Sequence, residues 1–304
     1  MGNHDPPWIH NQIFEWSRVL PLKELVVRIL DRGIPSLRIG SLFNLRKIYI
    51  EHLGSRVAPE FIDQLATLIS RCPNLTHLDI NCPRISIEEL FRVTNTNRTN
   101  PPLSIENLNL MLVKVTPVGF ELALRHLKAL KHFGLHNKMG MIVGSHRANI
   151  WAILRREKII LSTISTDWLD PEGLGLYLRA FHGLKNLHVQ PNYPPGGLSS
   201  PLDLLQVVSL RHSISLVELE IDANHSHQWE WPFDEASRRA LSSFPNLKIF
   251  GVTLGSRFSY QQNVALESIV SALSFYIPSF TGSCYLRKPY STSASQTFPN
   301  YNGL

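Results

Sequence analysis

Charged residues are scarce in this chain: Asp, Glu, Lys and Arg make up 18% of its 304 residues, against about 25% in typical globular proteins. With 43% hydrophobic residues, this scarcity excludes an intrinsically disordered chain, because disorder requires low hydrophobicity and high charge. Glycine (17) and proline (20) are too few and too irregularly spaced for a collagen-like or low-complexity protein. No apolar run approaches the roughly 18 residues needed to span a membrane, so we expect no membrane association.

Cysteine is also rare. The three cysteines, Cys72, Cys82 and Cys284, form no C-x-x-C pair, and an odd number without paired spacing argues against a disulfide framework. Cys72 and Cys82 flank an apolar segment, so we interpret them as small buried hydrophobic residues. Residues 1–7 show no secretory signal. We therefore expect a cytoplasmic or nuclear protein.

The net charge is only mildly basic, +6 at pH 7. Positive residues come in short groups, such as Arg155 with Arg156 and Lys158, or Arg238 with Arg239. None reaches the 5–8 residue basic clusters that mark nucleic-acid-binding patches. We expect no nucleic-acid partner.

What the chain has in excess is leucine, in a recurring pattern: an apolar residue, two variable residues, an apolar residue, one variable residue and another apolar residue. The copies begin 23 to 32 residues apart. Such a spacing is typical of leucine-rich repeats, whose period is about 20–29 residues. The nine copies are Leu22/Leu25/Val27, Leu45/Ile48/Ile50, Leu75/Leu78/Ile80, Ile105/Leu108/Leu110, Leu130/Phe133/Leu135, the weaker Leu161/Ile164/Thr166, Leu184/Leu187/Val189, Leu216/Leu219/Ile221 and Leu247/Phe250/Val252.

Between the copies the apolar period changes from that of a strand to that of a helix, as in Phe61, Leu65 and Leu68. A strand–helix unit cannot bury its apolar face alone, so neighbouring units stack into one continuous core. The sequence therefore predicts an α/β leucine-rich-repeat solenoid, with a curved parallel sheet on the concave face and helices on the convex face.

The pattern also predicts the domain organisation. We expect an N-terminal capping helix or partial repeat over residues 1–21, repeats over 22–262, a C-terminal capping helix over 263–280 and a disordered tail over 281–304. Two inserts, 95–102 and 140–151, are interpreted as loops. A solenoid lengthens without starting a second core, so one elongated, monomeric domain is expected.

Three segments share a further signature, C/F-P-N-L-x-x-L or a variant of it. They are Cys72-Pro73-Asn74-Leu75-Thr76-His77-Leu78-Asp79-Ile80, Phe244-Pro245-Asn246-Leu247-Lys248 and Phe181-His182-Gly183-Leu184-Lys185-Asn186-Leu187-His188-Val189. The region from about residue 8 to 278 resembles the leucine-rich-repeat region of fungal F-box proteins. The resemblance implies that the repeats hold a substrate, while an F-box docks to a Skp-type adaptor of a cullin–RING ubiquitin ligase. An F-box needs about 40–50 residues, and the first repeat begins at Leu22, so we expect adaptor docking only if an F-box is supplied upstream.

Catalytic motifs are absent: the sequence contains no G-x-S-x-G, G-x-x-x-x-G-K-[ST] or H-E-x-x-H. We expect neither an enzyme nor a cofactor. His225 and His227 could offer two imidazoles to a metal, but no third ligand stands nearby, so no metal site is predicted.

The concave face is the predicted binding site, because solenoids typically bind partners there. Side chains alternate between the two faces of a strand, so when the apolar residues face the core, the residues between them face the concave side. The candidate partner-binding residues are Lys47, Tyr49, His77, Asp79, Asn81, Asn107, Asn109, Met111, His132, His136, Asp167, Asn186, His188, Gln190, Glu218, Glu220 and Asp222.

We predict a protein or peptide partner for this face. Glu218, Glu220 and Asp222 favour a basic segment at one end, and the concave histidines suggest binding that changes between about pH 5 and 7. Two alternatives remain open. One is a free-standing repeat scaffold or inhibitor unrelated to ubiquitin; the other is a GTPase-activating protein or other enzyme using an exposed arginine, for which Arg28 is the inner-face candidate.

Overall fold

The computed structural model describes residues 22–29, 38–52, 57–96, 101–136, 144–191, 198, 200–222, 229, 231, 235–253 and 283–287. Its central feature is one sheet of ten strands, in which every strand pairs in parallel with the next in sequence order. The strands are β1 (Glu24–Ile29), β2 (Lys47–His52), β3 (His77–Asn81), β4 (Asn107–Met111), β5 (His132–His136), β6 (Thr163–Thr166), β7 (Asn186–Val189), β8 (Glu218–Ile221), β9 (Ile249–Thr253) and β10 (Ser283–Arg287).

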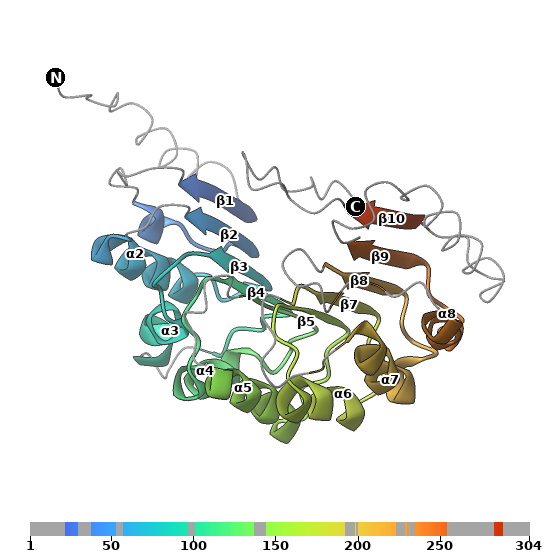
Figure 1. Ribbon diagram of the computed structural model, residues 1–304. Coiled ribbons are helices and arrows are strands. Elements are labelled where there is room, and N and C mark those ends of the chain that lie inside the picture. Colours follow the sequence, from blue (N-terminus) through green and yellow to red (C-terminus); the bar gives the residue numbers. More distant parts are fainter. Residues whose placement is uncertain are drawn as a thin grey trace.

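Helices follow most of the strands and cover one side of the sheet. The chain curves so that the strands line the inner side and the helices form the outer side (Figure 1). The α-helices are α2 (Pro59–Ser70), α3 (Ile87–Thr96), α4 (Pro117–Ala123), α5 (Gly144–Arg156), α6 (Leu176–Ala180), α7 (Pro201–His212) and α8 (Glu235–Ser242). Short helical turns η1 (Ile39–Ser41), η2 (Leu124–His126) and η3 (Pro171–Gly175) complete the set. The predicted α/β architecture is confirmed at this level.

The nine predicted repeat copies coincide with β1–β9. In β3, for example, Leu78 and Ile80 are fully buried, while His77 and Asp79 between and beside them are half-exposed. The weakest copy follows the same rule, because Ile164 and Thr166 of β6 are both fully buried. Since the apolar positions of every unit point to the same side, they merge into one continuous core under the helices.

Aromatic rings join the middle units of this core. Phe120, Phe133, Trp151, Tyr177 and Phe181 form an unbroken series, with ring centroids 5.1–5.7 Å apart from one member to the next. The series runs from α4 to the residue after α6, so it crosses the boundaries between successive strand–helix units. Tilted and edge-on contacts of this kind add to the burial of apolar area.

Several helices begin with proline. Pro59, Pro117, Pro171 and Pro201 each stand at the first helical positions of α2, α4, η3 and α7. Proline suits this position because its fixed φ is helical and its missing N–H would have no intrahelical acceptor. The sequence therefore marks the helix starts directly.

Side chains at the end of a strand–helix unit also satisfy backbone amides at the start of the same unit. Just before a strand begins, a buried N–H cannot join the sheet, and a side chain near the end of the following helix accepts its hydrogen bond. The pairs are Leu45 with Cys72 Sγ (3.4 Å), Leu103 with His126 Nδ1 (2.9 Å), Leu161 with Tyr177 Oη (2.9 Å) and Leu184 with His212 Nδ1 (3.2 Å). Each pair holds the end of a unit against its beginning.

Two predictions are wrong. Residues 144–151 were expected in a loop but lie in α5, where Ile150, Trp151 and Leu154 are buried at helical spacing. Residues 283–287 were expected in a disordered tail but form β10, paired in parallel with β9, which extends the sheet by one strand. The predicted capping segments, 1–21 and 263–280, lie outside the described residues. Cys72 and Cys82 are free and buried, as predicted.

Candidate binding face of the sheet

The side of the sheet opposite the helices, here called the concave face, presents its side chains in rows that cross the strands. Parallel pairing without a shift in register places equivalent positions side by side. The first row is Glu24, Lys47, His77, Asn107, His132, Thr163, Asn186, Glu218 and Ile249. The second row is Val26, Tyr49, Asp79, Asn109, Gly134, Ser165, His188, Glu220 and Gly251. The third row, from β1 to β5, is Arg28, Glu51, Asn81, Met111 and His136.

Most predicted partner-binding residues are partly exposed on this face. They are Lys47, Tyr49, His77, Asp79, Asn107, Asn109, Met111, His132, Asn186, His188, Gln190, Glu218 and Glu220. Ten strands about 4.8 Å apart make a surface on the order of 40 Å long. A surface of that length fits an extended polypeptide better than a small molecule.

Four of the predicted residues are instead buried, so the prediction that they face a partner is wrong. Asn81, His136, Asp167 and Asp222 are each less than one-tenth exposed. All four stand at or just after the end of a strand, where the chain turns towards the next helix and the alternation of inward and outward side chains stops. Asp222, for example, accepts a hydrogen bond from Gln190 Nε2 at 3.2 Å.

At the β1–β2 end of the face, opposite charges pair across the two strands. Arg28 Nε lies 3.2 Å from Glu51 Oε2, and Lys47 Nζ lies 3.8 Å from Glu24 Oε2. These pairs cancel the charge of this end. Arg28, the candidate arginine of the enzyme alternative, is therefore engaged by a carboxylate of its own chain.

At the centre of the face, Asn109 forms a hydrogen bond with Asp79 and packs over a glycine, Gly134. Asn109 Nδ2 donates to Asp79 Oδ2 at 3.1 Å, and the rest of the Asn109 amide lies over Gly134, where a Cβ atom would stand 2.2 Å from Asn109 Oδ1. Burial raises the pKa of Asp79, an effect that the hydrogen bond from Asn109 opposes.

The two half-exposed histidines of the first row are biased towards the neutral form. Burial lowers the pKa of His77, with a further contribution from the positive charge of Lys47. Burial likewise lowers the pKa of His132, helped by His77 and Lys131. Proton uptake by these rings on the folded protein therefore requires a pH below the usual value of about 6.5.

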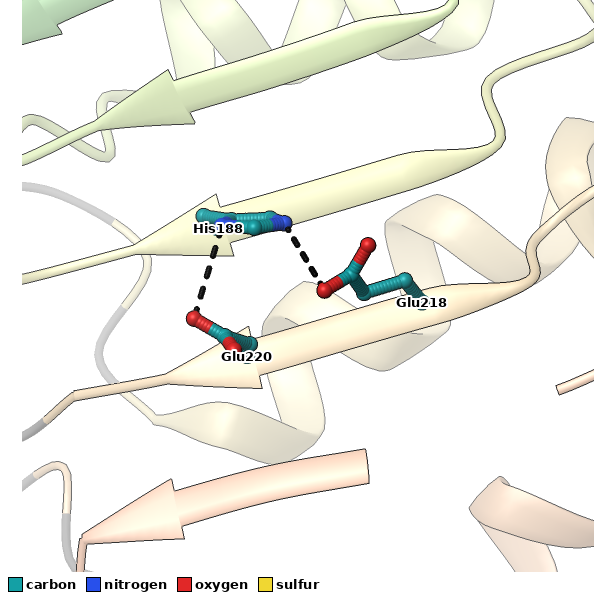
Figure 2. A group of neighbouring side chains, drawn as sticks. All are labelled: His188, Glu218 and Glu220. Carbon is teal, nitrogen blue, oxygen red and sulfur yellow. Dashed lines mark ion pairs between the residues drawn. The ribbon is translucent and has the colours of Figure 1, made fainter. Parts of the chain in front are cut away.

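At the other end, three side chains converge. His188 of β7 stands between two glutamates of β8, with Nε2 3.4 Å from Glu218 Oε1 and Nδ1 3.4 Å from Glu220 Oε2. Figure 2 shows the imidazole between the two carboxylates. Asn186 Nδ2 donates a hydrogen bond to the second oxygen of Glu218. Pairing with His188 holds the pKa of Glu218 below its ordinary value, although burial opposes the effect.

The β7–β8 end of the face differs from the β1–β2 end in its charged residues. Two carboxylates share one imidazole, and none of the described concave positions of β6–β9 carries lysine or arginine. The sequence named all three residues as candidates but did not place them together. The repeat register contains that information, because aligning Val189 with Ile221 sets His188 beside Glu220.

Other residues of the face were missed by the sequence interpretation. Glu24 and Glu51 complete the ion pairs at one end, and Gly134 makes room for Asn109 in the middle. Their signal was again the register, since each occupies a row position next to a residue that was named. His225 and His227, considered for a metal site, lie outside the described residues.

Comparisons with known proteins do not supply a function. No protein-family model matches the chain, and no curated protein is significantly similar to it. Among the described residues, no helix has both the length and the apolar character needed to cross a lipid bilayer. The geometry of the concave face is therefore the basis for assigning a function.

Proposed function

We propose that this chain is a leucine-rich-repeat protein without enzymatic activity, and that its concave face binds a protein or peptide. The observation that carries the proposal is the open sheet itself: helices cover one side, while the other presents two long rows of half-exposed, mainly polar side chains. Repeat solenoids use such surfaces for extended partners. The free, buried thiols of Cys72 and Cys82 suit a cytoplasmic or nuclear location.

The charge distribution defines the chemistry of the partner. Because the ion pairs at β1–β2 cancel, the acidic residues that remain in the described rows are Asp79 at the centre and Glu218 and Glu220 on β8. Complementary potentials steer binding partners. The preferred partner is thus an extended segment with lysine or arginine near the end that lies over β7–β8.

A binding experiment tests this proposal. Peptides selected from a random display library on the full chain should be enriched in lysine and arginine. Their affinity should fall at least about tenfold for the double variant Glu218→Gln/Glu220→Gln, and it should weaken with salt. The matched control is Glu121→Gln/Glu157→Gln, which removes two carboxylates that pair with Arg156 away from the concave rows. Equal losses in both double variants would contradict the proposal.

We further propose, from the resemblance to F-box proteins, that the bound segment is a substrate for ubiquitination. This role requires an F-box to recruit a Skp-type adaptor. Sequencing the transcript upstream of Met1, and co-purifying the adaptor and cullin with the resulting product, tests it. Partner binding without any adaptor would favour the free-standing scaffold or inhibitor.

A further inference from the structure

We propose that His188, Glu218 and Glu220 bind a divalent transition-metal ion, with Zn²⁺ as the ion to test first. One ring nitrogen and one oxygen from each carboxylate would be the ligands. Among the described residues, this is the one group of three such side chains whose potential ligand atoms all lie within 4.8 Å of one another. The inference does not depend on the proposed peptide binding.

The residue types and spacing suit this ion. Zinc takes imidazole nitrogen and carboxylate oxygen at about 2.0–2.2 Å, so neighbouring ligands of a tetrahedral site stand about 3.3 Å apart. His188 Nε2 and Glu218 Oε1 are already 3.4 Å apart. Glu220 Oε2 faces the other ring nitrogen, Nδ1, at 3.4 Å, so the Glu220 side chain would have to rotate to reach an ion bound by Nε2. The three ligand atoms start within 4.8 Å of one another.

The imidazole of His188 makes only long contacts with the two carboxylates. Nε2 of His188 is shielded from solvent, and its contact with Glu218 Oε1, at 3.4 Å, is longer than an ordinary N–H···O hydrogen bond. The side chains of His188, Glu218 and Glu220 are 20%, 18% and 14% exposed, so their charges are only partly solvated. A metal ion would use the ring nitrogen and offset the two carboxylates together.

The surroundings support the cluster in two ways. The hydrogen bond from Asn186 occupies one oxygen of Glu218 and leaves the other facing the ring, which is the role of an outer-shell residue at a metal site. In the second row, Ser165 and Gly251 flank the cluster, so no large side chain of that row covers it. With three protein ligands, a coordination position remains open towards the concave face.

The test is a calorimetric titration of the purified full chain with Zn²⁺ alone. We expect His188→Gln and Glu218→Gln each to weaken one zinc site at least tenfold, and Asn186→Ala to weaken it about tenfold. His132→Gln and Glu51→Gln, changes of the same type on the same face, should leave that site unaltered. Binding elsewhere, for example at His225 and His227, would be common to all variants and cancel in the comparison.

Thermal unfolding supplies a second readout. Zinc should raise the Tm of the wild-type chain and of His132→Gln, because a ligand that binds only the folded state stabilises it, and the part of this shift due to the cluster should be lost in Glu218→Gln. Circular dichroism verifies that each variant is folded. If His188→Gln does not fold, the zinc affinities of Glu218→Gln and Asn186→Ala test the proposal. Zinc affinities unchanged in these two folded variants would overturn the proposal.

Discussion

The backbone N–H of Leu103 donates a hydrogen bond to Nδ1 of His126, 2.9 Å away, which joins the start and the end of the unit formed by β4 and α4. The imidazole is buried and can accept this bond only while Nδ1 is unprotonated. Burial, with a smaller effect of Arg125, lowers the pKa of His126 to about 4. The closure of this unit therefore depends on a neutral histidine.

Stability should consequently fall in acid. In the unfolded chain His126 has an ordinary pKa near 6.5, so between about pH 6.5 and 4 the unfolded state binds the extra proton. The free energy of unfolding should decrease as the pH falls through this window, by up to roughly 3 kcal/mol from this residue. Chemical denaturation at pH 7, 5.5 and 4 measures the effect.

The variant His126→Phe separates this residue from other titrating groups. At pH 7 it should be less stable by about 1–3 kcal/mol, because the Leu103 N–H loses its acceptor, but its stability should change less with pH. His182→Phe, at an exposed histidine, should keep the wild-type pH dependence. If His126→Phe and the wild type lose stability in parallel, His126 is not the group responsible.

The aromatic series makes a second prediction. Trp151 is fully buried between Phe133 and Tyr177, so Trp151→Ala should lower the free energy of unfolding by about 3–5 kcal/mol. Leu210→Ala, which shortens an exposed apolar side chain of α7, should change it by less than about 0.5 kcal/mol. Urea denaturation of the two variants is the measurement; similar losses would place Trp151 outside the core.

A third prediction concerns the centre of the concave face. Gly134→Ala would place a Cβ atom against the Asn109 amide and displace it from Asp79, so we expect a loss of about 1 kcal/mol. In an Asn109→Ala background the same change should be nearly neutral, because the obstructing amide is gone. A double-mutant cycle by chemical denaturation measures the coupling, expected at about 0.5–1 kcal/mol. Simple additivity would show that the two residues act independently.

The fourth prediction tests the charge environment of the first row. The pKa of His77 is lowered by burial and then by Lys47, so Lys47→Met should raise it while leaving part of the decrease in place. An NMR titration of the histidine ring protons follows this change. Arg239→Met, an exposed cation that pairs with Glu235 on α8, serves as the control and should not affect His77. An unchanged His77 titration in Lys47→Met would contradict this assignment.

The repeat pattern explains how much of this molecule the sequence could predict. Every apolar position of the pattern in β2–β9 is buried, because a strand with one covered face must alternate. Alternation wrongly places Asn81 and Asp222 on the exposed side. Both stand where a strand ends, and both side chains are buried. The sequence interpretation missed strand β10, although Cys284 and Leu286 alternate with other residues as in a strand. The distance in sequence from the last repeat copy, Leu247/Phe250/Val252, to this segment is longer than the distances between the other copies.

Contacts between side chains of neighbouring strands were harder to predict than the face of the sheet on which each side chain lies. Alternation alone says that His188 and Glu218 share a face, and only the parallel register shows that they meet. Likewise, the contact of His126 with Leu103 depends on where a helix ends relative to an earlier strand, which no periodicity encodes. Contacts that depend on strand register or on the position of a helix end therefore required the structure.

The claim that the concave face binds an extended partner can be tested most directly by site-specific photo-crosslinking. A photoreactive amino acid would replace Thr163, half-exposed in the middle of the first row, or Leu122, which is 51% exposed on helix α4. With a basic peptide selected on the full chain, we predict crosslinking from position 163 and not from position 122. Crosslinking from position 122 alone, or equally from both, would contradict the account.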